Sequence, residues 1–427
     1  MATRRLTRRL AGVISKFTRD LQLNRVADHR SRRGRRHKLI QPLIVALIAG
    51  MVCGRKGLAE VEELTSDLSS AARRLLGIGK RFADTTLRHQ LLRLGLDDLR
   101  DALRRGVLSM GRSKALQPAG LPFGAVSMDG RSTSTNSWDP DDAFAQLHHP
   151  EGGAVYALVR TITTCLISSA ARICLDMHPI PAKTNENGVF SAAFAAMVEH
   201  FGHLFRVVLY DSGANAAANA RWVLTYGKDY LFRVQAEQPT IYDECKRCLG
   251  SRPVSTTNCV GSYIHGGKVV TRHLWFDENL AGWHDYPGLR CAIRLCSVSE
   301  DKATGERTTE NRYYITSLPA SALSKSKWGE LIRRHWSVEN NCHNTWDKLF
   351  REDKRPWVRL PRGMLNVMVL RRIAYNMMAW FREVAQRGEH KRQTPWKRLM
   401  TLFRDALVGL SDDALLSPRP LKVLAFD

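Results

Sequence analysis

The sequence predicts an α/β fold in which a small helical domain comes first and a β-rich insertion interrupts a mixed sheet with helices. Leucines recur at helical spacing from residue 39 to residue 114. Three apolar strand-like runs and then alternating helices and strands fill residues 121–235, and further strand-like runs dominate residues 236–312. Because alternating strands and helices are typical of a sheet covered by helices, these patterns predict an α/β core.

The charge balance is the most unusual property of the composition. The 427 residues include 65 Lys and Arg against 41 Asp and Glu, which gives a formal net charge of +24. Such a field favours polyanions, and nucleic acid is the commonest of them; a basic surface with no specific partner is the alternative. The nine cysteines are odd in number and scattered, which predicts a reducing compartment rather than a disulfide framework.

Two short patterns bear on metal binding and location. Cys245 and Cys248 form a lone C-x-x-C without a second pair at zinc-ribbon spacing, so buried thiols are favoured over a metal site. The basic start leads into no apolar signal-peptide region, and the apolar run Leu39–Cys53 is shorter than the roughly 20 residues that span a bilayer. We therefore expect a cytoplasmic protein that does not contact a membrane.

The N-terminal part reads as a basic arm followed by helices. Residues 1–38 end in DHRSRRGRRHK, a run typical of a solvated arm that binds nucleic acid. A buried helix is predicted for LIQPLIVALIAGMV, and an amphipathic helix for LAEVEELTSDLSSAARRLL. Leucines repeat at helical spacing in LRHQLLRLGLDDLRDALRRGVLSM, which follows the N-cap candidates Asp84-Thr85-Thr86. Arg88, His89 and Arg93 either lie along DNA or pack between helices.

The central part alternates between strands and helices. PFGAVSMD, VYALVRTITTCLI and ARICLDMHPI predict three strands, and FSAAFAAMVEHFG, FRVVLYD, NAAANARWVLTYG and DYLFRVQ then predict helix, strand, helix and strand. YIHGGKVVTRHLWF, with a turn at Gly266-Gly267, and GLRCAIRLCSV mark the insertion. The expected segments are an arginine-rich arm (1–38), a helical domain (39–120), the first part of the core (121–235), a β-rich insertion (236–312), the rest of the core with the Glu339 helix (313–385) and a C-terminal tail (386–427).

Two aspartates follow apolar strands of the predicted core. Asp129 ends PFGAVSMD and Asp211 ends FRVVLYD, and ligands of open α/β sheets bind at the carboxyl ends of strands. Carboxylates on neighbouring strands form a hard oxygen site suited to Mg²⁺. Strand-end aspartates are also common turn residues, so either one alone is a weak signal.

A third acidic residue lies in a denser pattern. His335, Glu339, His343 and Asp347 recur every four residues, a spacing that places them along one face of a helix. This stripe is either part of a site or a solvated face. Its spacing does not match H-E-x-x-H, so a metalloprotease is disfavoured. Two aspartates and one glutamate around Mg²⁺ in a basic protein indicate phosphoryl transfer.

These motifs resemble those of the H-repeat-associated insertion-sequence transposases, a bacterial branch of the DDE transposases with an RNase H-like core. The similarity runs from about Asp28 to Ile373. The helical block DHRSRRGRRHKLIQPLIVALIAGMVCGRKGLAEVEE, SMDG at 127–130, KTNE at 183–186, LYDSGANA around Asp211 and HGGKVVTR at 265–272 are similar to segments of that family. The most specific match is RRHWSVENNCHNTWDKLFRED, which resembles R-x-H-W-x-I-E-N-x-x-H-W-x-L-D-x-x-F-x-E-D with Glu339 as the catalytic glutamate.

The resemblance implies a DNA transposase that binds terminal inverted repeats, hydrolyses a phosphodiester bond and directs the freed 3′-hydroxyl at target DNA. It implies a catalytic and metal-binding triad that holds Mg²⁺, with Mn²⁺ as a substitute, and a homodimer assembled on DNA in the nucleoid of a bacterial cytoplasm. The helical domain at 39–120 would bind DNA. The triad would be Asp129, Asp211 and Glu339; His335, His343 and Asp347 would support it; and Arg131, Lys183, Arg272, Arg333 and Arg334 would contact DNA.

The chain departs from the family pattern in two places near the site. After Asp211, RVQAEQPT keeps only Gln238-Pro239-Thr240 of an A-L-K-G-N-Q-like motif, and Arg131 stands where a lysine is usual. Arginine keeps the charge of lysine but changes the geometry of phosphate contacts. Two alternatives stay open at this point: a metal-dependent nuclease without strand transfer, and a non-catalytic DNA-binding repressor derived from a transposase.

Overall fold

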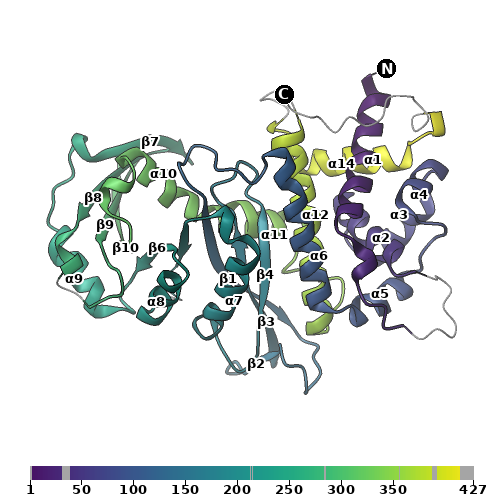
Figure 1. The fold of residues 1–427 in the computed structure, drawn as a ribbon, viewed down its shortest axis with the longest axis horizontal. Helices are drawn as coiled ribbons and strands as arrows, with labels where there is room; N and C mark the ends of the chain where they lie inside the picture. The colour runs from purple at the N-terminus through teal and green to yellow at the C-terminus, as the bar shows by residue number, and fades with distance from the viewer. Residues whose placement is uncertain are drawn as a thin grey trace.

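The computed structural model describes residues 2–30, 39–211, 213, 215–282, 285–354, 356–386 and 392–413. A single ten-stranded sheet lies beside a helical domain, and its far end curves into a separate lobe (Figure 1). None of the helices in these described ranges combines the length and apolar character that crossing a bilayer requires.

The core of the sheet has five strands in the order β4-β3-β1-β5-β6. β1 runs parallel to β5, and β5 runs parallel to β6, whereas β3 is antiparallel to both β1 and β4. This arrangement confirms the RNase H-like mixed sheet with helices that the sequence predicts. The strands are β1 (Ala125–Thr135), β3 (Tyr156–Cys165), β4 (Cys174–Ile180), β5 (Val207–Tyr210) and β6 (Asp229–Val234), with the short β2 (Gln146–His148) added beside β3.

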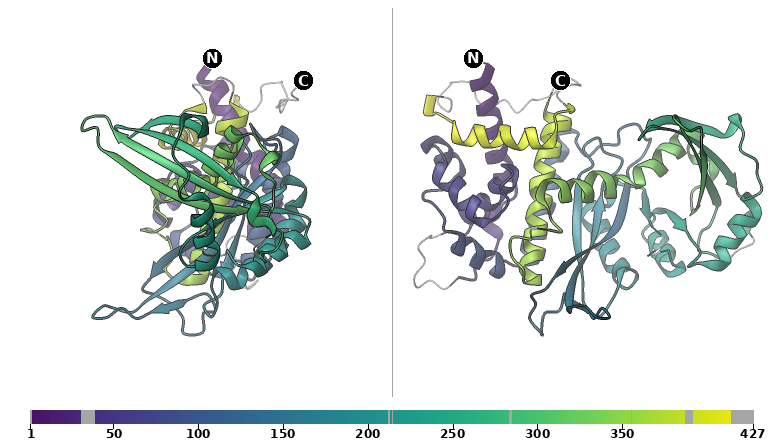
Figure 2. Two further views of the ribbon diagram at one scale, coloured as in Figure 1. Left: turned by 90° about the vertical axis from the view of Figure 1, so that its left-hand side faces the viewer. Right: turned by 180° about the vertical axis from the view of Figure 1, so that it is seen from behind.

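The insertion continues the core sheet instead of forming a sheet of its own. β10 (Arg307–Thr316) pairs antiparallel with β6, and β9 (Cys291–Asp301), β8 (Lys268–Asp277) and β7 (Cys259–His265) follow in order. The turn expected at Gly266-Gly267 is confirmed, since both glycines have the positive φ angles (55° and 80°) that suit them. The first part of this segment, however, is the helix α9 (Pro239–Leu249), which packs on β8 and β9 (Figure 2).

Both ends of the chain contain helices where the sequence analysis placed an arm and a tail. α1 (Ala2–Asp20) buries Leu10, Ile14 and Phe17 and packs against α14 (Trp396–Val408). The arginines of the arm obscured this helical spacing of apolar residues. Residues 31–38, the most basic part of the expected arm, and 414–427 of the tail lie outside the described residues.

The remaining helices form the helical domain and the second half of the core. Most of the predicted helices are present at the predicted places. They are α2 (Gln41–Val52), α3 (Leu58–Asp67), α4 (Ser70–Leu76), α5 (Asp84–Arg93), α6 (Leu96–Ser109), α7 (Glu186–Phe201), α8 (Ala217–Thr225), α10 (Lys325–His335), α11 (Asn344–Phe350) and α12 (Pro361–Trp380).

Helix α12 joins the helical domain to the sheet (Figure 1). Its buried Asn366 donates to the carbonyl oxygens of Leu91 (2.8 Å) and Leu94 (3.0 Å), which satisfies acceptors at the C-terminal end of α5. Ten residues later, Asn376 accepts from the amide of Cys174 (2.8 Å) and donates to its carbonyl oxygen (2.7 Å). The side chain of Asn376 thereby pairs with the outer edge of β4 as another strand would.

A second connection between helical domain and sheet is ionic. Arg100 and Arg104 of α6 both donate to the buried carboxylate of Asp176 on β4, at 2.9 and 2.8 Å. Burial alone would raise the pKa of Asp176, but the two guanidinium charges hold it below its ordinary value. Burial and the charge of Arg100 lower the pKa of the neighbouring His178 to about 4, so this histidine is neutral at pH 7.

A buried ionic cluster ties the strand that carries Asp129 to α12. Glu352 lies in the link after α11 and is paired with Arg131 of β1 (Nε–Oε1 3.1 Å) and with Arg371 and Arg372 of α12. The guanidinium of Arg372 also stacks on the indole of Trp346, 3.7 Å from the ring centre. Glu352, Arg371 and Arg372 are each at most 1% exposed, so this single carboxylate balances several desolvated cations.

The pKa of Glu352 reflects that balance. Burial favours the protonated acid, but the charges of Arg372, Arg131 and Arg371 outweigh it and lower the pKa from 4.5 to about 2. Burial likewise lowers the pKa of Arg371, to about 10, which leaves it charged at neutral pH. The stabilisation that Glu352 contributes is therefore complete above pH 4.5 and is lost as the pH falls toward 2.

Replacing Glu352 with glutamine is expected to lower the free energy of unfolding by about 3–5 kcal/mol at pH 7, because the arginines lose their counter-ion. The difference from wild type should shrink as the pH falls from 4.5 toward 2, because the wild-type carboxyl then becomes neutral too. Urea denaturation at pH 7 and at pH 3 measures both effects.

The matched control is Asp353→Asn, which makes the same kind of change at the exposed neighbouring carboxylate. It should change the unfolding free energy by no more than about 0.5 kcal/mol. Equal effects of the two substitutions would show that the buried cluster does not stabilise the fold in the proposed way.

Candidate active site

Asp129 and Asp211 lie side by side at one edge of the core sheet. The last residues paired between the parallel strands β1 and β5 are Met128 and Tyr210, so the two aspartates occupy the next position on each strand. Neighbouring strands are about 4.8 Å apart, which places both carboxylates within reach of one ion. Their side chains are 26% and 38% exposed, whereas the strand residues before them are buried. The sheet therefore holds two accessible acids on rigid backbone.

A histidine contacts the first aspartate. Nδ1 of His343 lies 3.3 Å from Oδ2 of Asp129, and its ring packs on Trp346 with centroids 5.3 Å apart. The other ring nitrogen, Nε2, is buried and makes no hydrogen bond with the described residues. His343 is thus a direct neighbour of the acidic pair, as its place in the four-residue spacing suggested.

Cations surround the second aspartate. Nη1 of Arg233, on the adjacent strand β6, lies 3.3 Å from Oδ1 of Asp211. Arg233 and Arg312 of β10 both lie over the indole of Trp336, 5.5 and 4.8 Å from its centre. The sequence analysis did not single out either arginine, because the pairing of β5 with β6 brings Arg233 to Asp211, and the pairing of β6 with β10 brings Arg312 to the same indole.

Glu339 lies in a π-helical segment, η8 (Val338–His343), between α10 and α11. Val338 and Cys342 are buried and η8 packs on β1 and β3, while Glu339 itself is exposed. Short π-helical turns within helices are frequent at functional sites. In the described ranges, no three His, Cys, Asp or Glu side chains are close enough together to form a metal-binding group, so the three carboxylates do not converge fully in this conformation.

The π-helical turn changes the stripe that the sequence predicts. Because it widens the helix locally, residues four apart no longer face one direction. His335 and His343 are buried, Glu339 is exposed, and the half-buried Asp347 binds Arg131. The expectation of one continuous face is therefore wrong.

His335 fastens α10 to the strand that carries Asp129. Its Nδ1 is 3.0 Å from the hydroxyl of Ser127, and this hydroxyl also lies 3.3 Å from the carbonyl oxygen of His335. Burial lowers the pKa of His335, although the charges of Asp129 and Asp211 act in the opposite direction. A neutral imidazole fits a role in positioning the backbone before Glu339.

The residues expected to contact DNA fall into two groups. Arg131 pairs with Asp347 and Glu352, and Arg334 donates to the carbonyl oxygens of Ser168 and Ala119 and to Glu330. Both guanidinium groups are buried and committed to partners within the protein, so we no longer assign them to phosphate. Lys183 and Arg333 are exposed, and Arg272 is half-buried, 2.9 Å from the hydroxyl of Tyr263.

A fourth carboxylate belongs to this site. Glu186, at the start of α7, accepts a hydrogen bond from the Tyr210 hydroxyl at 3.2 Å. A Cβ atom on Gly130 would lie 1.7 Å from Oε1 of Glu186, so a side chain after Asp129 would displace this carboxylate from its present position. Burial, and then the charge of Asp129, raise the pKa of Glu186. The sequence analysis noted KTNE at 183–186 without assigning a role to its glutamate.

The donor set fits a hard divalent cation. Asp129 and Asp211 supply oxygen ligands from rigid strands, and the nearby Glu186 adds negative charge that only a cation would offset. Cys245 and Cys248, by contrast, lie in α9 of the insertion, and burial raises the pKa of Cys245 to about 12. Burial therefore keeps the Cys245 thiol protonated at neutral pH.

Known proteins share this core. A family model described as "Transposase DDE domain" matches residues 141–377, a range that contains Asp211 and Glu339 and begins after Asp129. The chain is 25% identical over 182 residues (40% of this chain, 47% of the relative) to "H repeat-associated putative transposase YhhI" of Escherichia coli K12. It is 28% identical over 138 residues (30% and 35%) to "Putative protein YbfL" of the same organism.

These comparisons agree with the topology of the sheet. The chain spans less than half the length of each of these two curated relatives, whereas the family model covers more than half of the chain. The strand order, with two aspartates on adjacent parallel strands, is that of the RNase H-like core. The chain belongs to the family of transposases with a DDE domain.

Proposed function

We propose that this transposase binds the terminal inverted repeats of its own element, hydrolyses a phosphodiester bond there and joins the freed 3′-hydroxyl to target DNA. The observation that carries the proposal is the alignment of Asp129 with Asp211 on adjacent parallel strands. The segment that contains Glu339 packs on the same strand β1, which makes Glu339 the natural third acid. The net charge of +24 favours a DNA substrate.

In this proposal Asp129, Asp211 and Glu339 would hold two Mg²⁺ ions, for which Mn²⁺ would substitute. Bound Mg²⁺ would activate the attacking oxygen and stabilise the leaving oxygen of the phosphodiester. Glu339 has to move toward the aspartates, and its exposed side chain is free of buried packing that would oppose this movement. His343 orients Asp129, and Arg233 lies where it can approach a phosphate held beside Asp211.

The proposed partners follow from the exposed cations. Lys183 precedes α7 beside the acidic site, and Arg333 precedes the Glu339 segment, so both can contact the backbone of a bound DNA end. Arg272 of β8 presents a guanidinium from the insertion. Because two ends must be held together for transposition, we propose a homodimer on DNA in the bacterial cytoplasm.

Asp211→Asn is expected to reduce nicking of DNA that carries the element's ends by at least about 100-fold, because one metal ligand loses its charge. Binding of the same DNA should stay nearly unchanged. Gel analysis of a labelled end with Mg²⁺ or Mn²⁺ measures cleavage, and fluorescence anisotropy measures binding. Asp243→Asn, an exposed change on α9, is the matched control and should cut like wild type.

The DNA products of this assay distinguish a transposase from a nuclease and from a repressor. Joined end–target product supports the transposase, whereas nicked ends without joined product would indicate a nuclease. If wild type binds the ends without any cleavage, the protein acts as a repressor, and if Asp211→Asn cuts as well as wild type, the acidic site is misassigned.

Glu186→Gln is expected to stabilise the metal-free protein at neutral pH, because it removes a buried negative charge beside Asp129. Since the pKa of Glu186 is raised in the folded state, the carboxyl is protonated in both states at low pH. The gain in melting temperature should therefore be near zero at about pH 4 and grow as the pH rises. Thermal melts in EDTA across this range measure it.

Glu199→Gln on the exposed side of the same helix is the control, and it should show no such pH dependence. In the presence of Mn²⁺, Glu186→Gln should lose part of the thermal stabilisation that the ion gives wild type. A variant less stable than wild type at every pH would show that Glu186 has a purely structural role.

A further inference from the structure

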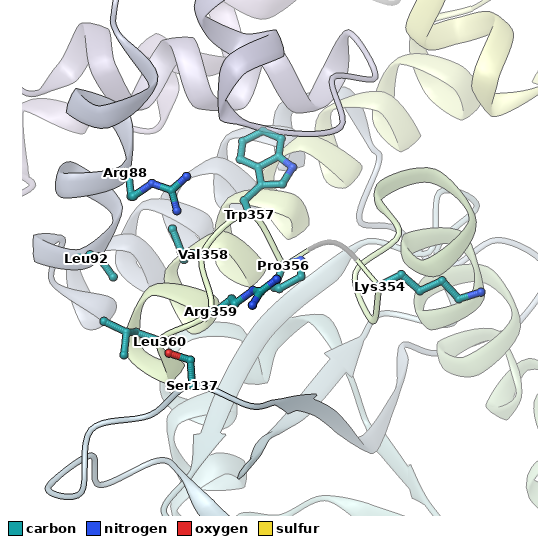
Figure 3. Close-up of a pocket in the computed structure, with 9 residues that line it drawn as sticks. All are labelled: Arg88, Leu92, Ser137, Lys354, Pro356, Trp357, Val358, Arg359 and Leu360. Carbon is teal, nitrogen blue, oxygen red and sulfur yellow. The ribbon is translucent and has the colours of Figure 1, made fainter. Parts of the chain in front are cut away.

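A cleft of about 620 Å³ lies between the helical domain and the core (Figure 3). One wall is α5, and the other is the link between α11 and α12, with the loop after β1 at its edge. It lies apart from the acidic residues of the active site. Its lining consists of Arg88, Leu92, Ser137, Lys354, Pro356, Trp357, Val358, Arg359 and Leu360.

The cleft carries positive charge without compensation. Arg88, Lys354 and Arg359 are exposed, and none of their side chains has a hydrogen bond or ion pair with another described residue. No acidic residue is among those that line the cleft. Most arginines near the active site are instead paired, as Arg131 and Arg233 are. Arg88 and Arg359 lie at the hollow, and the Lys354 side chain extends away from it beside the link (Figure 3); together these unpaired cations favour a ligand with several negative charges.

The wall of the cleft is preformed by packing. Val358 is 2% exposed, and a Cβ on Gly363 would lie 2.7 Å from Val358 and 2.8 Å from Leu92, so glycine lets the two walls meet. Trp357 has a φ of 68°, which is unusual for a bulky residue, and its ring lies 5.9 Å from the guanidinium of Arg371. The buried cluster around Glu352 thus fixes the shape of the cleft.

The cleft is also fixed to the strand that carries Asp129. The hydroxyl of Thr135, the last residue of β1, donates to the carbonyl oxygen of Arg359 at 2.8 Å. Thr135 is six residues beyond Asp129 on the strand, which at about 3.3 Å per residue corresponds to roughly 20 Å. At about 3.4 Å per base pair, that span equals roughly six base pairs of duplex DNA.

We propose that this cleft binds the phosphodiester backbone of the element's end about six base pairs from the bond cleaved at Asp129 and Asp211. The inference rests on the proposed function. Arg88, Lys354 and Arg359 contact phosphates of this segment, and Arg88 brings the helical domain onto the same duplex that the core cleaves. The cleft therefore sets the distance between the bound segment and the cleaved bond, without reading bases.

The test compares two triple variants with equal charge loss. Arg88→Gln/Lys354→Gln/Arg359→Gln removes the cations of the cleft, and Arg19→Gln/Lys397→Gln/Arg398→Gln removes exposed cations of α1 and α14, none of which lines the cleft. Binding of a labelled 40-base-pair duplex, cut from the DNA that flanks the coding region, is measured against salt concentration. The cleft variant should lower the slope of log K against log salt by about 2–3, and the control by less than 1.

Binding needs no cleavage, so this result is independent of whether wild type proves to be a transposase. If both triple variants change the slope equally, the cleft is not a DNA site. If the slope changes but wild type never cuts, the cleft assignment stands and the proposed function fails.

Hydroxyl-radical footprints show whether the cleft binds phosphates of the element's end or phosphates of target DNA. On the end duplex, wild type should protect a stretch about six base pairs from the nick, and the cleft variant should lose that protection alone. An unchanged footprint on the end duplex, with protection lost instead on unrelated target DNA, would overturn the assignment to the element's end. In cleavage assays the cleft variant should raise KM and leave kcat within about twofold, because its residues do not touch the reacting phosphate.

Discussion

The rest of the structure depends on one buried carboxylate. Glu352 balances Arg131, on the strand that carries Asp129, and Arg371 and Arg372 of α12, and without it these desolvated cations would repel one another. The same contacts fix the link after α11, which forms one wall of the basic cleft. They also fix the position of α11 beside η8. The ion pairs of Glu352 therefore hold both the acidic site and the cleft in place, although no residue belongs to both.

The insertion shows a second constraint, which is mechanical. Because β10 pairs with β6, and β6 pairs with the strand before Asp211, the insertion is continuous with the core sheet through hydrogen-bonded strands. A sheet of this kind twists but does not hinge between strands. If DNA contacts Arg272 of β8 as proposed, the contact would be transmitted to Asp211 through three intervening strands instead of a flexible linker.

The sequence predicted the parts of the site that depend on local pattern. The apolar runs before Asp129 and Asp211 are enough to place both acids at strand ends, and the dense motif around Glu339 marks its segment. Glu186 was missed because its approach to Asp129 and its hydrogen bond with Tyr210 depend on how α7 packs on the sheet, which only the folded structure reveals. Arg131 and Arg334 were expected to contact DNA because the sequence does not show that their side chains are buried. The helix α1 was not predicted because arginines separate its apolar residues.

The residues that pair with Glu352 lie far apart in the sequence, and this affects how the chain folds while it is being synthesised. Arg131 and Arg372 are about 240 residues apart, so at 5–20 residues per second roughly 10–50 s pass between their synthesis on the ribosome. During that interval the strand that carries Asp129 has the charge of Arg131 but lacks both Glu352 and the helix that covers the edge of β4. The nascent chain therefore depends on late-made residues to complete its core, and truncated products of the gene would be poorly folded and exposed to proteolysis.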